Sequence, residues 1–270
     1  MIDSKTHNSP IKVKPIHKNG FSWPPSIFQL LLYFLDLFFS LDFYLFTLNS
    51  LASRLVLMWI IVGIYSFFFV LTLFAIIMGS AIDPSDPTIK ITQNCKEKDI
   101  PFPDEDRYNF QCKICKSHVE DRSKHCGECN RCVNEFDHHC LWLNNCVGKA
   151  NYKYFLALLI SGFFQCITII VINSYLIYSY VRSDGMVNLV NSLGNRVEIA
   201  AWIFNCFVLV GALVCGIYFG YLISLHLWLI KEGMTTYEYI LRLRTELQKK
   251  ANFDLEVNLN RKSLINQISS

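Results

Sequence analysis

The chain concentrates metal-binding and nucleophilic side chains in one polar segment, Arg122 to Gly148, which holds five cysteines and three histidines. Thiolates and imidazoles are ligands that Zn²⁺ prefers in structural sites, and the same groups act as nucleophile and base in enzymes. Eleven cysteines in a short secreted chain would suggest disulfides, whereas a cluster in the reducing cytosol more often binds metal. The compartment that contains this segment therefore decides between disulfide bonds and metal binding.

The spacing of the cluster contains an internal repeat, C-x2-C-x9-H-x6-C, whose two copies interleave with an offset of 14 residues. The first copy comprises Cys112, Cys115, His125 and Cys132, and the second comprises Cys126, Cys129, His139 and Cys146. Each copy offers three thiolates and one imidazole, a set that Zn²⁺ binds tetrahedrally. We therefore predict two closed, structural Zn²⁺ sites that fold a loop with almost no apolar core. Pairing in simple sequence order is the alternative, which spacing alone does not exclude.

Two filled sites leave Cys140 and His138 unused. Together with Asp137 they supply a thiol, an imidazole and a carboxylate, the parts of a nucleophile, base and orienter set. A neighbouring histidine would lower the pKa of the thiol and favour the reactive thiolate. Asp137 and His138 could instead be exposed polar residues, but anchoring of His139 to zinc favours a positioned triad. His118 fits neither copy of the repeat and is expected in a loop.

The flanks of this segment are apolar enough to cross a membrane. Hydrophobic residues make up 52% of the 270 residues and charged residues only 17%, which is unusual for a soluble domain. Four runs reach the roughly 20 residues that a spanning helix needs: Ile27 to Leu48, Leu55 to Met78, Tyr154 to Val181 and Ile199 to Ile230. We predict an all-α integral membrane protein with four transmembrane helices and a zinc-binding Cys-rich domain between helices 2 and 3.

Lysine and arginine indicate the orientation, because they accumulate on the cytoplasmic side of a membrane. Four precede the first span and eleven lie between the second and third, whereas only Arg54 follows the first span. Two lie between spans three and four, and seven lie in the tail. Both termini and the Cys-rich loop are therefore expected in the cytosol. No cleavable signal peptide is expected, because a polar arm precedes an apolar run that is too long for one.

These elements divide the chain into five parts: an N-terminal arm (1–26), transmembrane helices 1 and 2 (27–78), a linker and Cys-rich zinc domain (79–153, core 110–153), transmembrane helices 3 and 4 (154–230), and a tail (231–270). Cys140 lies only about a dozen residues before the third span, close to the membrane surface. That position suits a substrate with its tail in the bilayer and its head in the cytosol, such as a long-chain acyl-CoA.

These residues resemble the Cys-rich domain of the DHHC protein S-acyltransferases, multi-pass palmitoyltransferases, with the motif "DHHC" at Asp137 to Cys140. The resemblance extends over the four spans, roughly from Asn19 to Asn260. "NGFSWP" (19–24) and "FDHHCLWLNNCVGKANY" (136–152) are most similar to the animal members numbered one and eleven. Three family positions differ: Ser85 and Glu256 replace glycines, and Leu141 replaces the usual proline.

The resemblance implies a mechanism and site residues. Cys140 would take the acyl group of palmitoyl-CoA as a thioester, with His138 as base and Asp137 as orienter, and pass it to cysteines of membrane-associated proteins. The family's two zinc sites match the interleaved assignment. "TTYE" matches the family's TTxE motif, which would bring Thr236 near Asp137, although Thr235 and Glu238 also have the spacing of a helix-capping box. Members of this family are expected in the ER, the Golgi or the plasma membrane.

Other residues allow two interpretations. Trp142 would lie against the acyl chain near its carbonyl end, or would anchor the chain at the membrane interface. Arg122 and Lys124 are candidates for binding the phosphates of CoA, or form a solvated basic surface. Asp36 would lie near the bilayer centre, where it faces the acyl cavity or pairs within the bundle.

Two other functions compete with acyl transfer. The first is a zinc-stabilised membrane scaffold without chemistry, which the departures from the family pattern leave open. Nucleic-acid binding is not expected, because a loop tied to the membrane at both ends has little access to a duplex.

Overall fold

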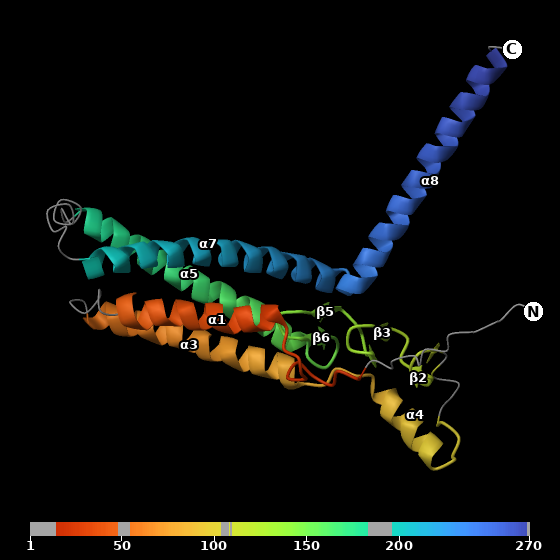
Figure 1. Cartoon of the computed structure of the whole chain (residues 1–270), viewed down its shortest axis with the longest axis horizontal. Helices are drawn as coiled ribbons and strands as arrows, with labels where there is room; N and C mark the ends of the chain where they lie inside the picture. The colour runs from red at the N-terminus through yellow and green to blue at the C-terminus, as the bar shows by residue number, and fades with distance from the viewer. Residues whose placement is uncertain (1–14, 48–54, 104–107, 109, 183–195, 269–270) are drawn as a thin grey trace, which may run out of the picture.

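A computed structural model describes residues 15–47, 55–103, 108, 110–182 and 196–268. Its long helices run side by side, with a set of short hairpins at one end of the bundle (Figure 1). The helices are α1 (Ile27–Leu41) with its π-helical extension η1 (Asp42–Thr47), α3 (Leu55–Ala81), α5 (Tyr152–Arg182) and α7 (Arg196–Lys231). Four of the helices are long and apolar enough to cross a membrane, which confirms the predicted spans. Lys5, Lys12, Lys14, Arg54 and Arg107, used in the orientation argument, lie outside the described residues.

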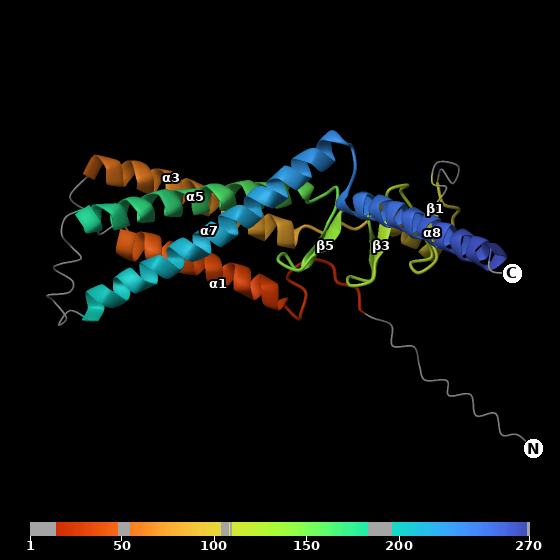
Figure 2. The same ribbon diagram turned by 90° about the horizontal axis from the view of Figure 1, so that it is seen from above.

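α5 is the centre of the bundle and packs along both α3 and α7, and α7 crosses the other helices obliquely (Figure 2). The close approach of α5 and α7 depends on Gly162, because a Cβ atom there would lie 2.9 Å from the ring of Phe219. Among the described residues the bundle core is mostly apolar and aromatic. It includes the stacked rings of Phe43 and Tyr65, whose centroids are 3.8 Å apart. Packing of apolar helices in this way is typical of membrane bundles, where small residues allow helices to approach.

In its described residues the Cys-rich domain has three antiparallel hairpins, which follow α4 (Pro87–Glu97) in the chain. They are β1–β2 (Phe110–Cys112, Ser117–Val119), β3–β4 (Lys124–Cys126, Arg131–Val133) and β5–β6 (His138–Cys140, Asn145–Val147). Each turn has a residue with φ near 50°, namely Lys116, Asn130 and Asn144, which are 14 residues apart. The sequence repeat is therefore a repeat of hairpins.

The hairpin repeat corrects the expectation for His118. This residue lies in β2, paired with Gln111, in the register that pairs Cys132 with His125 and Cys146 with His139. Its Nε2 is 3.0 Å from Gln111 Nε2, and its ring stacks on Phe102. The prediction of a loop was wrong because the first hairpin has no cysteine at this position to show the repeat.

Side-chain amides join the hairpins to the end of α3. Asn145 is fully buried, and its Nδ2 lies 3.0, 3.2 and 2.9 Å from the carbonyl oxygens of Gly79, Ser80 and Ile82. Asn151 Nδ2 donates to Gly79 at 3.1 Å. The last carbonyls of a helix lack partners within it. These amides therefore satisfy the end of α3 and fix the third hairpin against the bundle.

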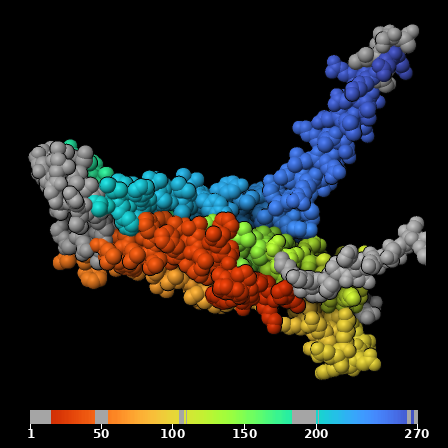
Figure 3. Space-filling view, viewed as in Figure 1, coloured from red at the N-terminus to blue at the C-terminus, as the bar shows by residue number. Residues whose placement is uncertain are grey.

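The tail forms one long helix, α8 (Thr236–Ile268), which projects away from the rest of the chain (Figure 1 and Figure 3). Phe253, Asp254 and Asn260, which resemble the family's tail motif, are exposed on it. Only the first turn of α8 contributes to the site described below.

Candidate functional site

The hairpins bring the eight predicted zinc ligands into two clusters. One contains Cys112, Cys115, His125 and Cys132, the other contains Cys126, Cys129, His139 and Cys146, and in each the ligand atoms lie within 4.8 Å of one another. This is the interleaved arrangement and excludes pairing in sequence order. Each cluster uses the C-x2-C turn of one hairpin and the paired strands of the next, so every site joins two hairpins.

The geometry of both clusters fits Zn²⁺. Ligands at tetrahedral Zn–S and Zn–N distances would place two sulfurs roughly 3.8 Å apart and a sulfur and a nitrogen roughly 3.6 Å apart. Cys132 Sγ lies 3.6 Å from Cys115 Sγ, and Cys146 Sγ lies 3.4 Å from Cys129 Sγ. The distances from the sulfurs to the Nδ1 atoms of His125 and His139 are between 3.3 and 3.8 Å. No cysteine of either cluster is in a disulfide, and four ligands leave no position for a substrate.

Cys140 occupies the first cysteine position of the third hairpin, but this hairpin has Leu143 where the others have a second cysteine. Its thiol therefore lacks the partners of a metal site. Cys140 is 5% exposed and packs with Leu143 and Phe155. The nucleophile candidate is thus buried where the third hairpin packs on the helices.

Asp137 and His138 are in contact, as the triad prediction requires. His138 Nδ1 lies 2.6 Å from Asp137 Oδ2. Thr236 adds two hydrogen bonds: its Oγ1 donates to Asp137 Oδ2 at 2.8 Å and its backbone N–H donates to Oδ1 at 2.8 Å. Asp137 is buried, so these bonds compensate its lost hydration. The N-terminus of α8 also stabilises the negative charge of this carboxylate.

The first turn of α8 forms the capping box as well. Thr235 N–H donates to Glu238 Oε2 at 2.8 Å, and Glu238 N–H donates to Thr235 Oγ1 at 3.2 Å. The two interpretations of "TTYE" are therefore compatible, because Thr235 and Glu238 begin the helix while Thr236 holds Asp137.

The electrostatics of this group favour a reactive thiol. Burial lowers the pKa of His138, but the hydrogen bonds to Asp137 and Cys140 outweigh it and raise the pKa to about 9. Burial raises the pKa of Cys140, and the bond to His138 more than offsets this, so the pKa lies below its usual value. Burial also raises the pKa of Asp137, but His138 and Thr236 hold it below its ordinary range. The arrangement supports a thiolate beside an imidazolium.

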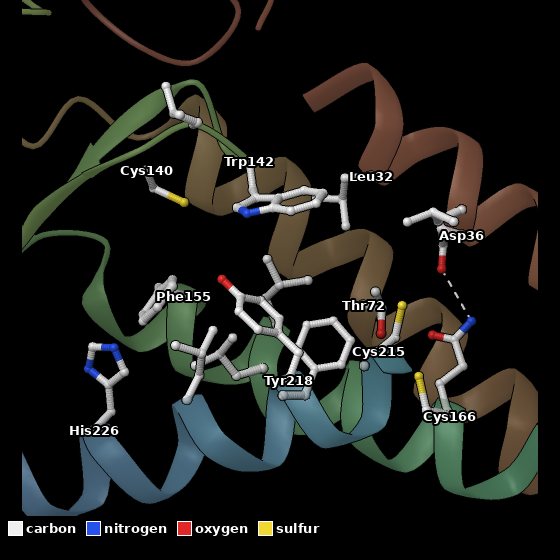
Figure 4. A pocket seen from close by; sticks show the side chains of 18 of the residues that line it. Leu32, Asp36, Thr72, Cys140, Trp142, Phe155, Cys166, Cys215, Tyr218 and His226 are labelled. Carbon is white, nitrogen blue, oxygen red and sulfur yellow. Dashed lines mark hydrogen bonds between the residues drawn. The ribbon is translucent and has the colours of Figure 1, made fainter. Parts of the chain in front are cut away.

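Cys140 lies at one end of a cavity of about 420 Å³ between the helices (Figure 4). Its walls are mostly apolar and include Trp142, whose ring contacts Phe28 with centroids 5.4 Å apart, together with Leu32 and Tyr218. A cavity of this size and polarity is suited to an apolar ligand.

The far end of the cavity is polar. Asp36 Oδ1 accepts a hydrogen bond of 3.2 Å from Gln165 Nε2, which also donates to Tyr65 at 3.1 Å. Thr72, Cys166 and Cys215 lie at the same end (Figure 4). Asp36 therefore both faces the cavity and pairs within the bundle.

Arg122 has a partner that the sequence did not suggest. Its Nε and Nη2 donate to Glu238 Oε1 and Oε2 at 2.8 and 2.6 Å, and Nη2 also donates to the Gly233 carbonyl at 3.3 Å. This ion pair links the turn before β3 to the start of α8. Lys124 lies in β3 and is half-buried. Binding of CoA phosphates by Arg122 and Lys124 stays a prediction.

The chain is similar to known protein sequences. The sequence profile of the DHHC palmitoyltransferase family matches residues 105–242, about half of the chain. This chain belongs to the DHHC palmitoyltransferase family. Human palmitoyltransferase ZDHHC11 is 29% identical over 210 residues, which cover 70% of this chain and 50% of that protein. Zebrafish (Danio rerio) palmitoyltransferase ZDHHC1 is 33% identical over 257 residues, 84% of this chain and 42% of that protein.

A plant relative extends the comparison. Probable protein S-acyltransferase 20 of Arabidopsis thaliana is 34% identical over 178 residues, 62% of this chain and 25% of that protein. The predicted likeness to animal members one and eleven is confirmed. This DHHC family member spans about half the length of the human relatives that it matches.

Sequence reasoning missed several residues of this site. Asn145 and Asn151 position the third hairpin, and Arg131, almost fully buried, pairs with Asp83 at 2.6 Å. Asp83 also accepts from Ser85 N–H, so the turn that departs from the family pattern still forms. A charged residue between the ligands Cys129 and Cys132 was a signal for Arg131.

Proposed function

We propose that this chain is a protein S-acyltransferase that moves a long-chain acyl group from acyl-CoA through Cys140 to cysteine thiols of membrane-associated proteins. One observation carries the proposal. The thiol of Cys140 interacts with His138, which Asp137 and Thr236 orient, and it lies at the end of an apolar cavity between membrane-length helices. A reactive thiol at such a cavity suits a substrate that combines a thioester with a long apolar chain.

In the first half-reaction the proton of the Cys140 thiol lies on His138, and the thiolate sulfur attacks the carbonyl carbon of the thioester. The bond to the CoA sulfur breaks, and CoA leaves as a thiol after it takes up a proton from His138. The second half-reaction repeats these steps with the thiol of a substrate protein as nucleophile and Cys140 as leaving group. Asp137 keeps its negative charge and orients His138, because it is hydrogen-bonded to Thr236 and His138 at the same time.

Two Zn²⁺ ions in the clusters of Cys112, Cys115, His125 and Cys132 and of Cys126, Cys129, His139 and Cys146 would have a structural role. Zinc would supply folding free energy to hairpins that bury few apolar side chains. His139 follows His138 directly, so the second site would also fix the backbone of the catalytic hairpin. Among the described residues the hairpins have only a small apolar cluster of their own, which supports this role.

We further propose where the substrate groups lie. The acyl chain would occupy the cavity with Trp142 near its carbonyl end, and Lys124 and the remaining guanidinium nitrogen of Arg122 would bind CoA phosphates. The excess of Lys and Arg supports a cytosolic Cys-rich domain and cytosolic termini, in the ER, the Golgi or the plasma membrane. The division into arm, helix pairs, Cys-rich domain and tail remains our proposal for the domains.

The competing function is a zinc-stabilised scaffold without chemistry, and one experiment separates the two. The purified chain and its Cys140→Ser variant, at equal zinc content, are incubated with a labelled palmitoyl-CoA analogue. Hydroxylamine-sensitive label on the unsubstituted chain and none on Cys140→Ser is the expected result. Absence of label on both, with about two zinc ions per chain, would favour the scaffold.

A further inference from the structure

A second histidine lies beside the proposed catalytic residues and has no role in the chemistry above. His226 of α7 is 3% exposed and lines the cavity together with His138, Cys140 and Thr236. Its ring lies at the same end of the cavity as Cys140, next to Phe155 (Figure 4). A buried polar side chain at this position costs free energy unless it is hydrogen-bonded, so its partners define what it can do.

The two ring nitrogens of His226 differ in their hydrogen bonding. Tyr152 Oη lies 3.0 Å from Nδ1. Among the described residues, Nε2 has no hydrogen-bond partner, and the ring lines the cavity. Phe155 contacts the rings of both histidines edge-on, with centroids 4.9 Å from His226 and 5.0 Å from His138. The two imidazole centroids are 6.3 Å apart, so one substrate group at this end of the cavity can contact both rings.

The partners of the two Nδ1 atoms allow the two histidines different proton positions. Ionised Asp137 only accepts hydrogen bonds, so His138 Nδ1 carries a proton and its Nε2 is left to exchange a proton with the Cys140 thiol. The phenol hydroxyl of Tyr152 can donate a hydrogen bond to Nδ1 of His226, and in that orientation the proton of the neutral ring lies on Nε2. His138 thus handles the proton of Cys140, while His226 in this tautomer offers an N–H group to the cavity.

We propose that His226, oriented by Tyr152, donates a hydrogen bond from Nε2 to the oxygen of the reacting thioester. When the Cys140 thiolate attacks the carbonyl carbon, the new S–C bond forms and the π-electron pair moves to this oxygen. The N–H group stabilises the negative charge until the pair re-forms the C=O bond and the CoA thiolate leaves. His226 keeps its proton throughout. The same oxygen carries the charge in the second half-reaction, and the mostly apolar cavity strengthens the bond.

This inference rests on the proposed acyl transfer, and three variants of the full chain test it. His226→Phe keeps the ring packing and removes the donor, and His226→Gln keeps an N–H donor. Tyr152→Phe removes the hydroxyl that holds the tautomer of His226. Two rates are measured on each: labelling of Cys140 by the palmitoyl-CoA analogue at saturating concentration, and alkylation of Cys140 by iodoacetamide, followed by mass spectrometry of its peptide. Alkylation requires the thiolate but forms no oxyanion, so it reports the integrity of the site without the proposed bond.

Loss of one oxyanion donor commonly lowers a rate by about 10²–10³-fold, which is the expected effect of His226→Phe on labelling. The His226→Gln variant is expected to be labelled faster than His226→Phe. The labelling rate of Tyr152→Phe should lie between those of His226→Phe and the unsubstituted chain. The alkylation rate should be unchanged in all three variants. Labelling of His226→Phe at the unsubstituted rate would overturn the inference, as would a parallel fall in labelling and alkylation, which indicates a structural role. A chain that is alkylated but never acylated refutes the proposed function itself, and the inference with it.

Discussion

The ion pair between Arg122 and Glu238 is expected to control the rate of acyl transfer from a distance. Glu238 accepts two hydrogen bonds from Arg122 and also completes the capping box of α8. The intervening Thr236 holds Asp137, which orients His138. Arg122→Gln or Glu238→Gln should therefore loosen the first turn of α8 and, through it, the orientation of the imidazole.

The size of the effect follows from exposure and geometry. The side chains are 42% and 32% exposed, so solvent screens the pair, and exposed ion pairs contribute about 0.2–1 kcal/mol. The two parallel N–H···O contacts favour the upper end of this range. If the whole coupling is transmitted to the transition state, about 1 kcal/mol corresponds to a roughly fivefold lower rate.

Single-turnover labelling of Cys140 at several palmitoyl-CoA concentrations, on both single variants and the double variant, measures this coupling. We expect each single change to lower the maximal rate about fivefold, and the double variant to lose no more than either single one. Fully additive losses would refute the reasoning, because the two residues would then act independently. A higher half-saturating concentration for Arg122→Gln in both Glu238 backgrounds would report the proposed phosphate contact.

Three further outcomes are expected from other parts of the structure. Cys146→Ala should lower bound zinc from about two ions to about one per chain, measured by elemental analysis, and abolish labelling of Cys140; retention of both ions would contradict the ligand assignment. Asn145→Ala removes the hydrogen bonds to the end of α3 and should lower the free energy of unfolding by about 2–3 kcal/mol, measured by thermal unfolding in detergent. The exposed control Asn94→Ala should change thermal unfolding little. Equal shifts for the two variants would contradict the stabilising role of Asn145. Asp36→Ala opens the far end of the cavity and should shift the preference among competing acyl-CoAs toward longer chains, while an unchanged preference would mean that the acyl chain does not reach Gln165.

The zinc clusters were predictable because the information is local. Each ligand set comes from hairpins that recur every 14 residues, so ligand spacing in the sequence is fixed by hairpin geometry. The role of Cys140 followed by subtraction, since the third hairpin has Leu143 where the others have the second cysteine of the C-x2-C turn. His118 was misjudged for the same reason, because the repeat was sought in ligands alone and the first hairpin begins before its ligand pattern does.

The partners of Arg122 and Glu238 were not predictable in this way. They are 116 residues apart, and each has an ordinary local explanation, as a basic loop residue and as part of a capping box. From sequence alone, each of these residues is assigned to the local motif that contains it. Their contact requires the end of α7 to lie beside the turn before β3.

The sequence by itself determined four spanning helices, an interleaved repeat of eight candidate ligands and an unused cysteine, because hydropathy and ligand spacing act over short stretches of chain. The tertiary structure excluded pairing of these ligands in sequence order. Only the tertiary structure decided which side chains of the helices face the cavity. α7 has no amphipathic pattern in its sequence, so hydropathy does not indicate which of its faces points inward. The rotation that directs His226 toward Tyr152 and the proposed nucleophile comes from packing between helices, such as the contact of Gly162 with Phe219, and is set by shape rather than by polarity.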